Sequence, residues 1–221
     1  MKKVVILGTG GNSVDILETL QALNAAAPAP KYECMGFLDD APELRGKSIE
    51  GLPVLGPLDQ ARTLGDAFFV NGIGSPRNHF LKPTIIGRTG MPLDRFETVV
   101  HPSAQVSPSA SLGRGTVVLQ NATIAARAKV GAHVIVLPNS VLSHDDDIGD
   151  YTCVAGGVCV SGTVAVGIAC YLGSNCSIIQ NVRIGDFSMI GMGSVVLSDV
   201  PENAVYVGNP ASFLRPSKPP G

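Results

Sequence analysis

Residues 130–160 read VGAHVIVLPNSVLSHDDDIGDYTCVAGGVCV, and every sixth residue of this stretch, from Val130 to Val160, is aliphatic. The same spacing runs without a break from Val106 to Val196, which places sixteen aliphatic residues in one register. An α-helix has no period of six, whereas a short strand followed by a turn does. The spacing therefore predicts a parallel β-helix in which three hexads make one coil, with coils stacked about 4.8 Å apart.

The position four residues after each aliphatic is mostly Ala, Ser, Thr, Val or Cys, and such small residues fit a crowded inward corner of the coil. Asp146 occupies one of these positions, so the register predicts an inward acid that needs polar partners. The period does not fix the hand of the winding, although parallel crossovers are normally right-handed.

The first hundred residues have a different pattern. A short apolar run at residues 4–7 is followed by the glycine-rich residues 8–13, GTGGNS, and then by the helical spacing of residues 14–23. Further strands are expected at residues 32–38 and 67–73, with a helix at 77–90. We therefore expect an α/β, Rossmann-like βαβ domain over residues 1–98, a β-helix over 99–200, and a C-terminal cap and tail over 201–221.

A strand, a glycine-rich loop and a helix start form a cradle for a phosphate group. Ser13 stands where a third glycine would complete the dinucleotide fingerprint, so we reject NAD and favour one nucleotide or nucleotide-sugar. Loops at the carboxyl ends of parallel strands meet at one edge of the sheet, where ligands bind. The residues expected there are Gly10, Gly11, Asn12, Asp39, Asp40 and Gly74.

Composition excludes several classes of function. The net charge of −2 without a basic cluster argues against nucleic-acid binding, and no apolar run is long enough to span a membrane. The start, MKKVVILG, has too short an apolar run for a signal peptide, so we expect a cytoplasmic protein. The five cysteines form no C-x-x-C motif, so we expect reduced thiols and no metal.

Of the four histidines, His79 is expected on a solvated helix, His101 at the domain junction, and His133 facing outward. His144 precedes Asp145, and a carboxylate beside an imidazole holds one tautomer and supports a general base. Gly162 lies eighteen residues later, one coil along, where its backbone N–H could stabilise an oxyanion.

These features together resemble one family. The glycine-rich βαβ unit, Phe37–Asp40, Gly72–Gly74, His101–Ala104, the unbroken hexads and His144–Asp145 resemble the bacterial hexapeptide-repeat N-acetyltransferases of nucleotide-linked amino sugars, with sialic acid O-acetyltransferases in the same superfamily. The resemblance implies a left-handed β-helix, a homotrimer, acetyl-CoA as co-substrate bound between neighbouring columns, and a nucleotide-sugar held by the N-terminal domain.

The resemblance also implies roles for particular residues. His144 would be the catalytic base, Asp145 its orienting acid and Gly162 the oxyanion donor, while residues 10–12, 39–40 and 74 would hold the nucleotide-sugar. The residues implied at the coenzyme are Cys153, Gly162, Gly173, Ser174, Arg183 and Gly191. Two residues depart from the family pattern, because Cys153 and Asn12 stand where relatives often carry histidine.

The predicted reaction is direct acetyl transfer from acetyl-CoA to a sugar amine, with no acyl-enzyme and no essential cysteine. A sugar hydroxyl as acceptor remains open, because the same base serves an alcohol. A non-catalytic nucleotide-sugar sensor remains the third possibility. A zinc-dependent lyase is disfavoured, since His133 and His144 are eleven residues apart and on different sides of the predicted column.

Overall fold

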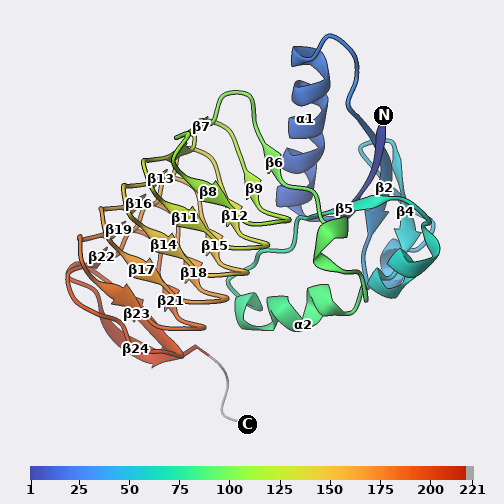
Figure 1. The fold of residues 1–221 in the computed structure, drawn as a ribbon. Helices are drawn as coiled ribbons and strands as arrows, with labels where there is room; N and C mark the ends of the chain where they lie inside the picture. Colours follow the sequence, from blue (N-terminus) through green and yellow to red (C-terminus); the bar gives the residue numbers. More distant parts are fainter. Residues whose placement is uncertain (218–221) are drawn as a thin grey trace.

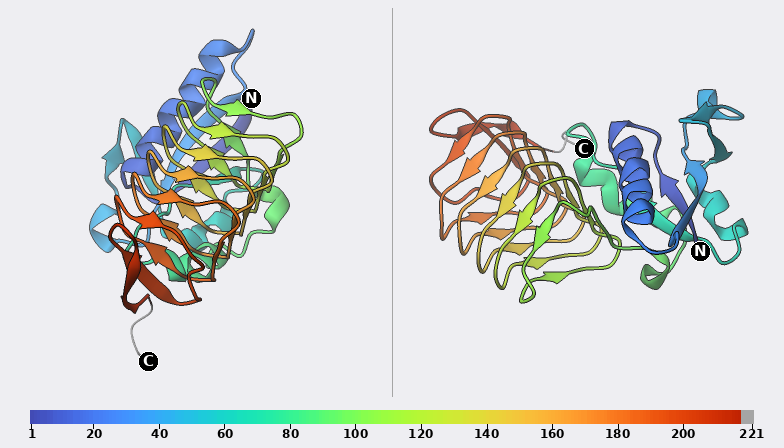
Figure 2. Two further views of the ribbon diagram at one scale, coloured as in Figure 1. Left: turned by 90° about the vertical axis from the view of Figure 1, so that its left-hand side faces the viewer. Right: turned by 90° about the horizontal axis from the view of Figure 1, so that it is seen from above.

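The computed structural model describes residues 1–217 and contains two parts that lie side by side (Figures 1 and 2). Residues 2–95 form a small α/β domain, and residues 99–216 form a column of short strands. No helix among residues 1–217 is both long and apolar enough to cross a bilayer.

The N-terminal domain is a five-stranded sheet with strand order β3-β4-β2-β1-β5. Strands β1, β2, β4 and β5 run parallel, and β3 pairs antiparallel with β4. The expected β-α-β order is therefore confirmed, and the short β3–β4 hairpin adds an edge that the sequence pattern did not reveal. The elements are β1 (Lys2–Leu7), α1 (Gly11–Ala26), β2 (Tyr32–Leu38), β3 (Ser48–Ile49), β4 (Leu52–Gly56), β5 (Phe68–Asn71) and α2 (Lys82–Gly87), with single 3-10 turns at Pro42–Leu44, Leu58–Thr63, His79–Leu81 and Leu93–Arg95.

The column has three parallel faces, each a sheet of strands from successive coils. We name them the domain face, the second face and the third face. The domain face holds β6 (Val99–Val100), β9 (Val117–Val118), β12 (Ile135–Val136), β15 (Cys153–Val154), β18 (Tyr171–Leu172) and β21 (Met189–Ile190). The second face holds β7 (Gln105–Val106), β10 (Thr123–Ile124), β13 (Val141–Leu142), β16 (Cys159–Val160), β19 (Ser177–Ile178) and β22 (Val195–Val196). The third face holds β8 (Ser111–Leu112), β11 (Lys129–Val130), β14 (Asp147–Ile148), β17 (Ala165–Val166) and β20 (Arg183–Ile184).

From β6 to β22, successive coils pair in parallel at an offset of eighteen residues, and only the last pairs, such as Ile190 with Tyr206, differ among the described residues. Leu142 pairs with Val160, and Ile148 pairs with Val166, one coil further along. The large aliphatic residues of the hexads point into one continuous core, where Leu142, Ile148 and Val154 are fully buried. The predicted left-handed β-helix is therefore confirmed.

The turns between faces owe their shape to a repeated backbone conformation. Three residues after each aliphatic, from residue 121 to 187, the backbone has positive φ, as at Asn139 (φ 61°), Asp145 (φ 63°) and Asn175 (φ 57°). Asn, Asp and Gly adopt this left-handed conformation at the lowest cost, and the sequence is rich in them at these positions. The side chain before each such residue is thereby presented at a corner of the column.

The N-terminal domain packs on the domain face of the column. Leu17 and Leu20 of α1 share a buried cluster with Val117, Ile135 and Cys153 of that face. Two histidines lie at the junction, and both expectations of solvent exposure were wrong. His133 is 3% exposed, and His79 is 2% exposed, with Nε2 3.2 Å from the carbonyl oxygen of Phe187. Both histidines are covered by contacts between the two parts of the chain.

His133 is held between aromatic rings from both sides of this junction. Its ring stacks on Tyr151 at 5.0 Å and meets the ring of Phe96 edge-on at 4.4 Å. Burial, together with the ammonium group of Lys82, lowers the pKa of His133 to about 4, against the opposing pull of Asp150. The ring is therefore neutral in the folded protein at neutral pH.

The expected helix at 77–90 is shorter than predicted, with a 3-10 turn at His79–Leu81 leading into α2 at Lys82–Gly87. At the other end of the chain, β23 (Ala204–Val207) continues the domain face beside β21. Strand β24 (Ser212–Pro216) then folds back antiparallel on β23. These strands are consistent with the expected cap over residues 201–217, and residues 218–221 of the expected tail lie outside the described residues.

The core of the column gives a direct test of the hexad register. Ile178 is 1% exposed and lies between Val160 and Val196 of the neighbouring coils, so Ile178→Ala should lower the free energy of unfolding by about 2–5 kcal/mol. Ser177→Ala is the matched control on the same strand, because Ser177 faces solvent. Urea unfolding of both variants checks the prediction, and equal losses would contradict the assigned register.

The buried His133 gives a pH-dependent test of the domain junction. Its pKa is about 4 when folded and about 6.5 when unfolded, so the unfolded chain binds the extra proton between these values. The contribution of His133 to stability should therefore fall by about 3 kcal/mol as the pH drops from 6.5 to 4. His133→Phe keeps an aromatic ring and should remove this slope from urea titrations across the range. Identical pH slopes in the two proteins would refute the assignment.

Candidate active site

His144 lies in the turn between β13 and β14, at the corner where the second and third faces of the column meet. Its side chain is 62% exposed, and Nδ1 lies 2.8 Å from Oδ2 of Asp145. The positive φ of Asp145 folds this turn so that adjacent side chains meet. With Nδ1–H donating to the carboxylate, the lone pair of the neutral ring is on Nε2, where it can accept a proton.

Asp145 is held in turn by Arg127, which occupies the same turn position one coil earlier. Nε of Arg127 donates to Oδ1, and Nη2 donates to Oδ2, both at 2.7 Å. The hydrogen bonds from Arg127 and then His144 hold the pKa of the Asp145 carboxyl well below its usual range. Asp145 is therefore ionised and fixed in orientation, as an orienting partner of a base must be.

Gly162 lies against the imidazole ring, one coil further along. A Cβ atom placed on Gly162 would come within 2.6 Å of Cε1 and 2.7 Å of Nε2 of His144, so a side chain here would displace the ring. Thr163 N–H donates to the carbonyl oxygen of His144 at 3.0 Å and keeps the two turns in register. Among residues 1–217, no acceptor takes the N–H of Gly162, which can thus donate to a ligand.

A second group of predicted residues meets at the edge of the N-terminal sheet. Helix α1 begins at Gly11, and Gly10 caps it without a side-chain hydrogen bond. Ser13, which breaks the dinucleotide fingerprint, is fully buried, and a Cβ on Gly72 would clash with its Oγ. The helix start therefore packs directly on the end of β5.

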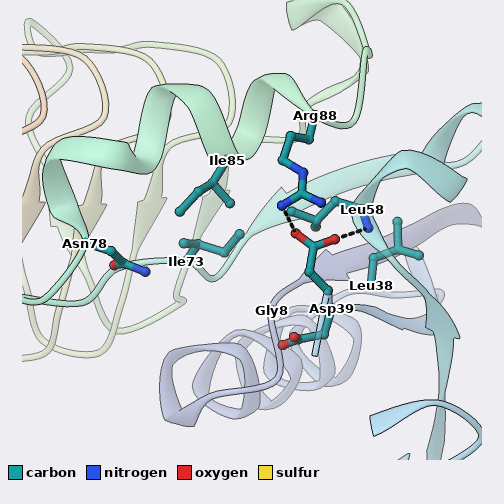
Figure 3. Close-up of a pocket in the computed structure, with 9 residues that line it drawn as sticks. Gly8, Leu38, Asp39, Leu58, Ile73, Asn78, Ile85 and Arg88 are labelled. Carbon is teal, nitrogen blue, oxygen red and sulfur yellow. Dashed lines mark hydrogen bonds and ion pairs between the residues drawn. The ribbon is translucent and has the colours of Figure 1, made fainter. Parts of the chain in front are cut away.

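Two adjoining cavities, of about 280 and 260 Å³, occupy this edge and share Gly8, Asp39 and Ile73 in their walls. The first is open above the glycine-rich loop. The second continues between apolar walls (Figure 3). Its apolar lining consists of Leu38, Leu58, Ile73 and Ile85. A phosphate-bearing ligand with a flat ring fits this sequence of polar cradle and apolar slot.

The two predicted carboxylates have different surroundings in these cavities. Asp39 lines both cavities, with Oδ2 accepting from the hydroxyl of Thr9 at 2.8 Å and Oδ1 accepting from the N–H of Ala41 at 3.0 Å. Asp40 forms an ion pair, because it lies 2.8 Å from Arg88, and it also accepts from the N–H of Leu58 at 3.0 Å. Asp40 therefore braces the wall of the slot.

Asn12 and Gly74 connect this edge to the column. Nδ2 of Asn12 donates to the carbonyl oxygen of Gly74 at 3.2 Å. A Cβ on Gly74 would lie 3.2 Å from Sγ of Cys153, so the loop after β5 rests on the domain face. The structure thus brings the six predicted nucleotide-sugar residues to one edge of the sheet.

The residues implied at the coenzyme do not gather within one chain. Gly173, Ser174 and Gly191 lie at the corner between the domain face and the second face, and Arg183 lies on the third face. Cys153 is 1% exposed and belongs to the cluster under the N-terminal domain. Among residues 1–217, no group of three His, Cys, Asp or Glu residues is arranged to hold a metal ion.

The base and the cavities also lie on opposite sides of the column. The N-terminal domain covers the domain face, whereas the β13–β14 turn that carries His144 lies at the opposite corner (Figure 1). A ligand held in the cavities of one chain is therefore remote from His144 of the same chain.

Sequence reasoning missed three polar residues of these sites. Arg127 could have been found, because it precedes Asp145 by eighteen residues, the offset that also relates His144 to Gly162. Thr9 and Arg88 gave no such signal, since their partners lie 30 and 48 residues away in non-repeating sequence.

Comparison with known proteins adds to this geometry. Residues 3–79 match the profile of the PglD N-terminal domain. The acetyltransferase domain of PglB from Neisseria gonorrhoeae in complex with acetyl coenzyme A is 27% identical, with a TM-score of 0.81 over 96% of this chain and 99% of that one. PerB from Caulobacter crescentus in complex with CoA and GDP-perosamine is 26% identical, with a TM-score of 0.80 over 97% and 98%.

A curated relative is UDP-N-acetylbacillosamine N-acetyltransferase of Bacillus subtilis, which is 33% identical over 125 residues. That match covers 54% of this chain and 52% of the relative, so the chain spans about half of that protein's length. The solved structures, in contrast, are matched along nearly their whole length. The chain thus resembles nucleotide-sugar N-acetyltransferases in both of its parts, as its sequence predicted.

Proposed function

We propose that this protein transfers the acetyl group of acetyl-CoA to the amino group of a nucleotide-linked amino sugar. The observation that carries the proposal is the imidazole of His144, oriented by Asp145 and packed against the Cα side of Gly162, whose N–H no acceptor takes among residues 1–217. Relatives of matching fold, which bind CoA together with GDP-perosamine in one case and acetyl coenzyme A in another, support it.

In the proposed reaction, the nitrogen of the sugar amine attacks the thioester carbon, and Nε2 of His144 takes a proton from that nitrogen. A new C–N bond forms, and the carbonyl oxygen becomes an oxyanion that the Gly162 N–H stabilises. Collapse of this intermediate breaks the C–S bond, and the imidazolium returns the proton to the CoA thiolate. No side chain forms a covalent bond with the acetyl group, so no cysteine is required.

The nucleotide-sugar is assigned to the two cavities of the N-terminal domain. The N–H groups at the start of α1 suit the phosphates, and the slot between Ile73 and Leu58 suits a base. Asp39 accepts hydrogen bonds from the ribose or the base. Calorimetric titration with UDP-, GDP- and dTDP-linked sugars identifies the nucleotide.

We infer that the working unit contains more than one chain, as a homotrimer. A nucleotide-sugar in the cavities of one chain cannot reach His144 across the column, so the base must come from a neighbouring copy. The implied coenzyme residues lie at different corners of the column, which fits a coenzyme groove between two columns.

Replacement of the base is the first test. His144→Ala should lower kcat/KM for acetylation of an amino sugar by about 10²–10⁴-fold, the usual contribution of a general base. Release of the CoA thiol, followed with 4-amino and hydroxy nucleotide-sugars, measures both the rate and the acceptor. His101→Ala is the matched control, since the imidazole of His101 hydrogen bonds only to Ser103 among residues 1–217, near the start of the column. Normal turnover by His144→Ala would remove the assignment, and turnover of hydroxy sugars alone would change the acceptor.

Mixed assemblies test whether two chains build each site. Gly10→Glu places a negative charge in the phosphate cradle and should lower turnover to near background, and His144→Ala should lower it about 10²–10⁴-fold. Chains that carry one change each are mixed in equal amounts, unfolded and refolded together. Half of the cavities and half of the bases are then intact, so roughly one quarter of the sites should combine both and regain activity. Absence of any recovery in mixed assemblies of confirmed composition would show that each site lies within one chain.

A further inference from the structure

Asp146 departs from the repeat on which the column is built. It lies four residues after Leu142, at an inward corner position, and it is 0% exposed. The equivalent residues of the flanking hexads are Ser140 and Thr152, which are neutral and also fully buried. A carboxyl group at this position costs free energy unless it is hydrogen bonded.

The two threonines at this position share one hydrogen-bonding pattern. Thr152 donates to the carbonyl oxygen of Gly167 at 2.9 Å and accepts from the N–H of Cys170 at 3.1 Å. Thr116 makes the same pair of contacts with Gly131 and Val134. The hydroxyl group thereby links its own turn to the next coil.

Asp146 retains one of these contacts and adds a different one. Oδ1 accepts from the N–H of Val164 at 2.9 Å, which is the usual contact to the next coil. Oδ2 accepts from the N–H of Ser143 at 2.7 Å, within its own turn. The carbonyl oxygen of Val160, in the next coil, accepts from the same N–H at 3.2 Å. A hydroxyl group has only one oxygen, so it cannot accept at both places.

These two contacts lie on either side of the candidate active site. Ser143 immediately precedes His144, and Val164 follows Gly162 by two residues. The carboxyl group therefore ties the turn that carries the imidazole to the turn that carries the Gly162 N–H. The spacing of the two turns is critical, because the ring atoms of His144 lie within 3.1 Å of where a Cβ on Gly162 would be.

We propose that Asp146 is a positioning residue that sets the placement of the His144 imidazole relative to the Gly162 N–H. This inference rests on the proposed function of those two residues. Asp146 does not contact substrate, and its effect on the reaction passes through His144.

The pKa of the buried carboxyl group determines the pH at which the test is made. Burial raises the pKa of Asp146 to about 7, although the N–H donors of Val164 and Ser143 oppose this rise. Its unfolded pKa is lower, so the contribution of Asp146 to stability falls as the pH rises between the two values. At pH 8, a neutral hydroxyl residue should therefore stabilise the fold at least as well as the carboxylate.

Asp146→Thr, measured at pH 8 in the full-length assembly, is the central experiment. Tm should be unchanged or higher, whereas kcat should fall about 10–100-fold, since small displacements of a catalytic group have such effects. KM for acetyl-CoA and for the amino sugar should stay within about twofold, because Asp146 touches neither binding region. Thr152→Val is the matched control at the next corner, and it should lower Tm and leave kcat unchanged.

A double variant separates positioning from a general structural effect. In the His144→Ala background, Asp146→Thr should cause no further loss of rate, because the group that it positions is absent. A loss of the same size in both backgrounds would overturn the proposal. So would wild-type kcat in Asp146→Thr, or a fall in Tm larger than that of Thr152→Val.

Asp146→Ser serves as the second variant and is judged by the same criteria if the threonine methyl group disturbs folding. Failure of the proposed function gives a different result. If His144→Ala itself turns over normally, the base is wrongly assigned. If His144→Ala is inactive while Asp146→Thr is fully active, only the role of Asp146 is wrong.

Discussion

Parallel hydrogen bonding between coils places the residues of strands β6 to β22 beside the residues eighteen positions away. This constraint builds the candidate site as well as the fold. Arg127 meets Asp145, His144 meets Gly162, and Asp146 meets Val164, each across one coil. Backbone hydrogen bonds hold the separation of the coils near 4.8 Å, so each pair meets at a distance that no loop has to maintain. A site made in this way is preorganised by the main chain.

The hexad period predicted which residues point inward, and the structure confirms this for the core of the column. The period could not predict which outward positions another part of the chain covers. His133 and His79 were expected in solvent for this reason, and both are buried where the N-terminal domain meets the column. The β3–β4 hairpin was missed because β3 has two residues and β4 contains Pro53, which leaves no alternation to detect.

The candidate site likewise contains residues that the sequence could predict and residues that it could not. The proximity of His144 to Asp145 could be predicted because they are adjacent in sequence. That of Gly162 could be predicted because it lies eighteen residues, or one coil, after His144. The glycine-rich loop and Asp39 follow from the ends of parallel strands. The sequence could not predict that Asp40, unlike Asp39, forms an ion pair, because its partner Arg88 lies 48 residues away at the end of α2. The coenzyme residues were carried over from a resemblance to a site between chains, and one chain alone does not bring them together.

The link between Arg127 and Asp145 bears on how the proposed base is held through the reaction. Oδ2 of Asp145 lies 2.8 Å from Nδ1 of His144, and both carboxylate oxygens also accept from the guanidinium group of Arg127. A two-pronged contact of this kind fixes the plane of a carboxylate, so the group that orients the imidazole is itself oriented. A base that takes a proton from an amine and returns it to a thiolate needs its Nε2 in one place for both transfers. The stacking of two coils meets this need, because it places Arg127 beside the carboxylate of Asp145.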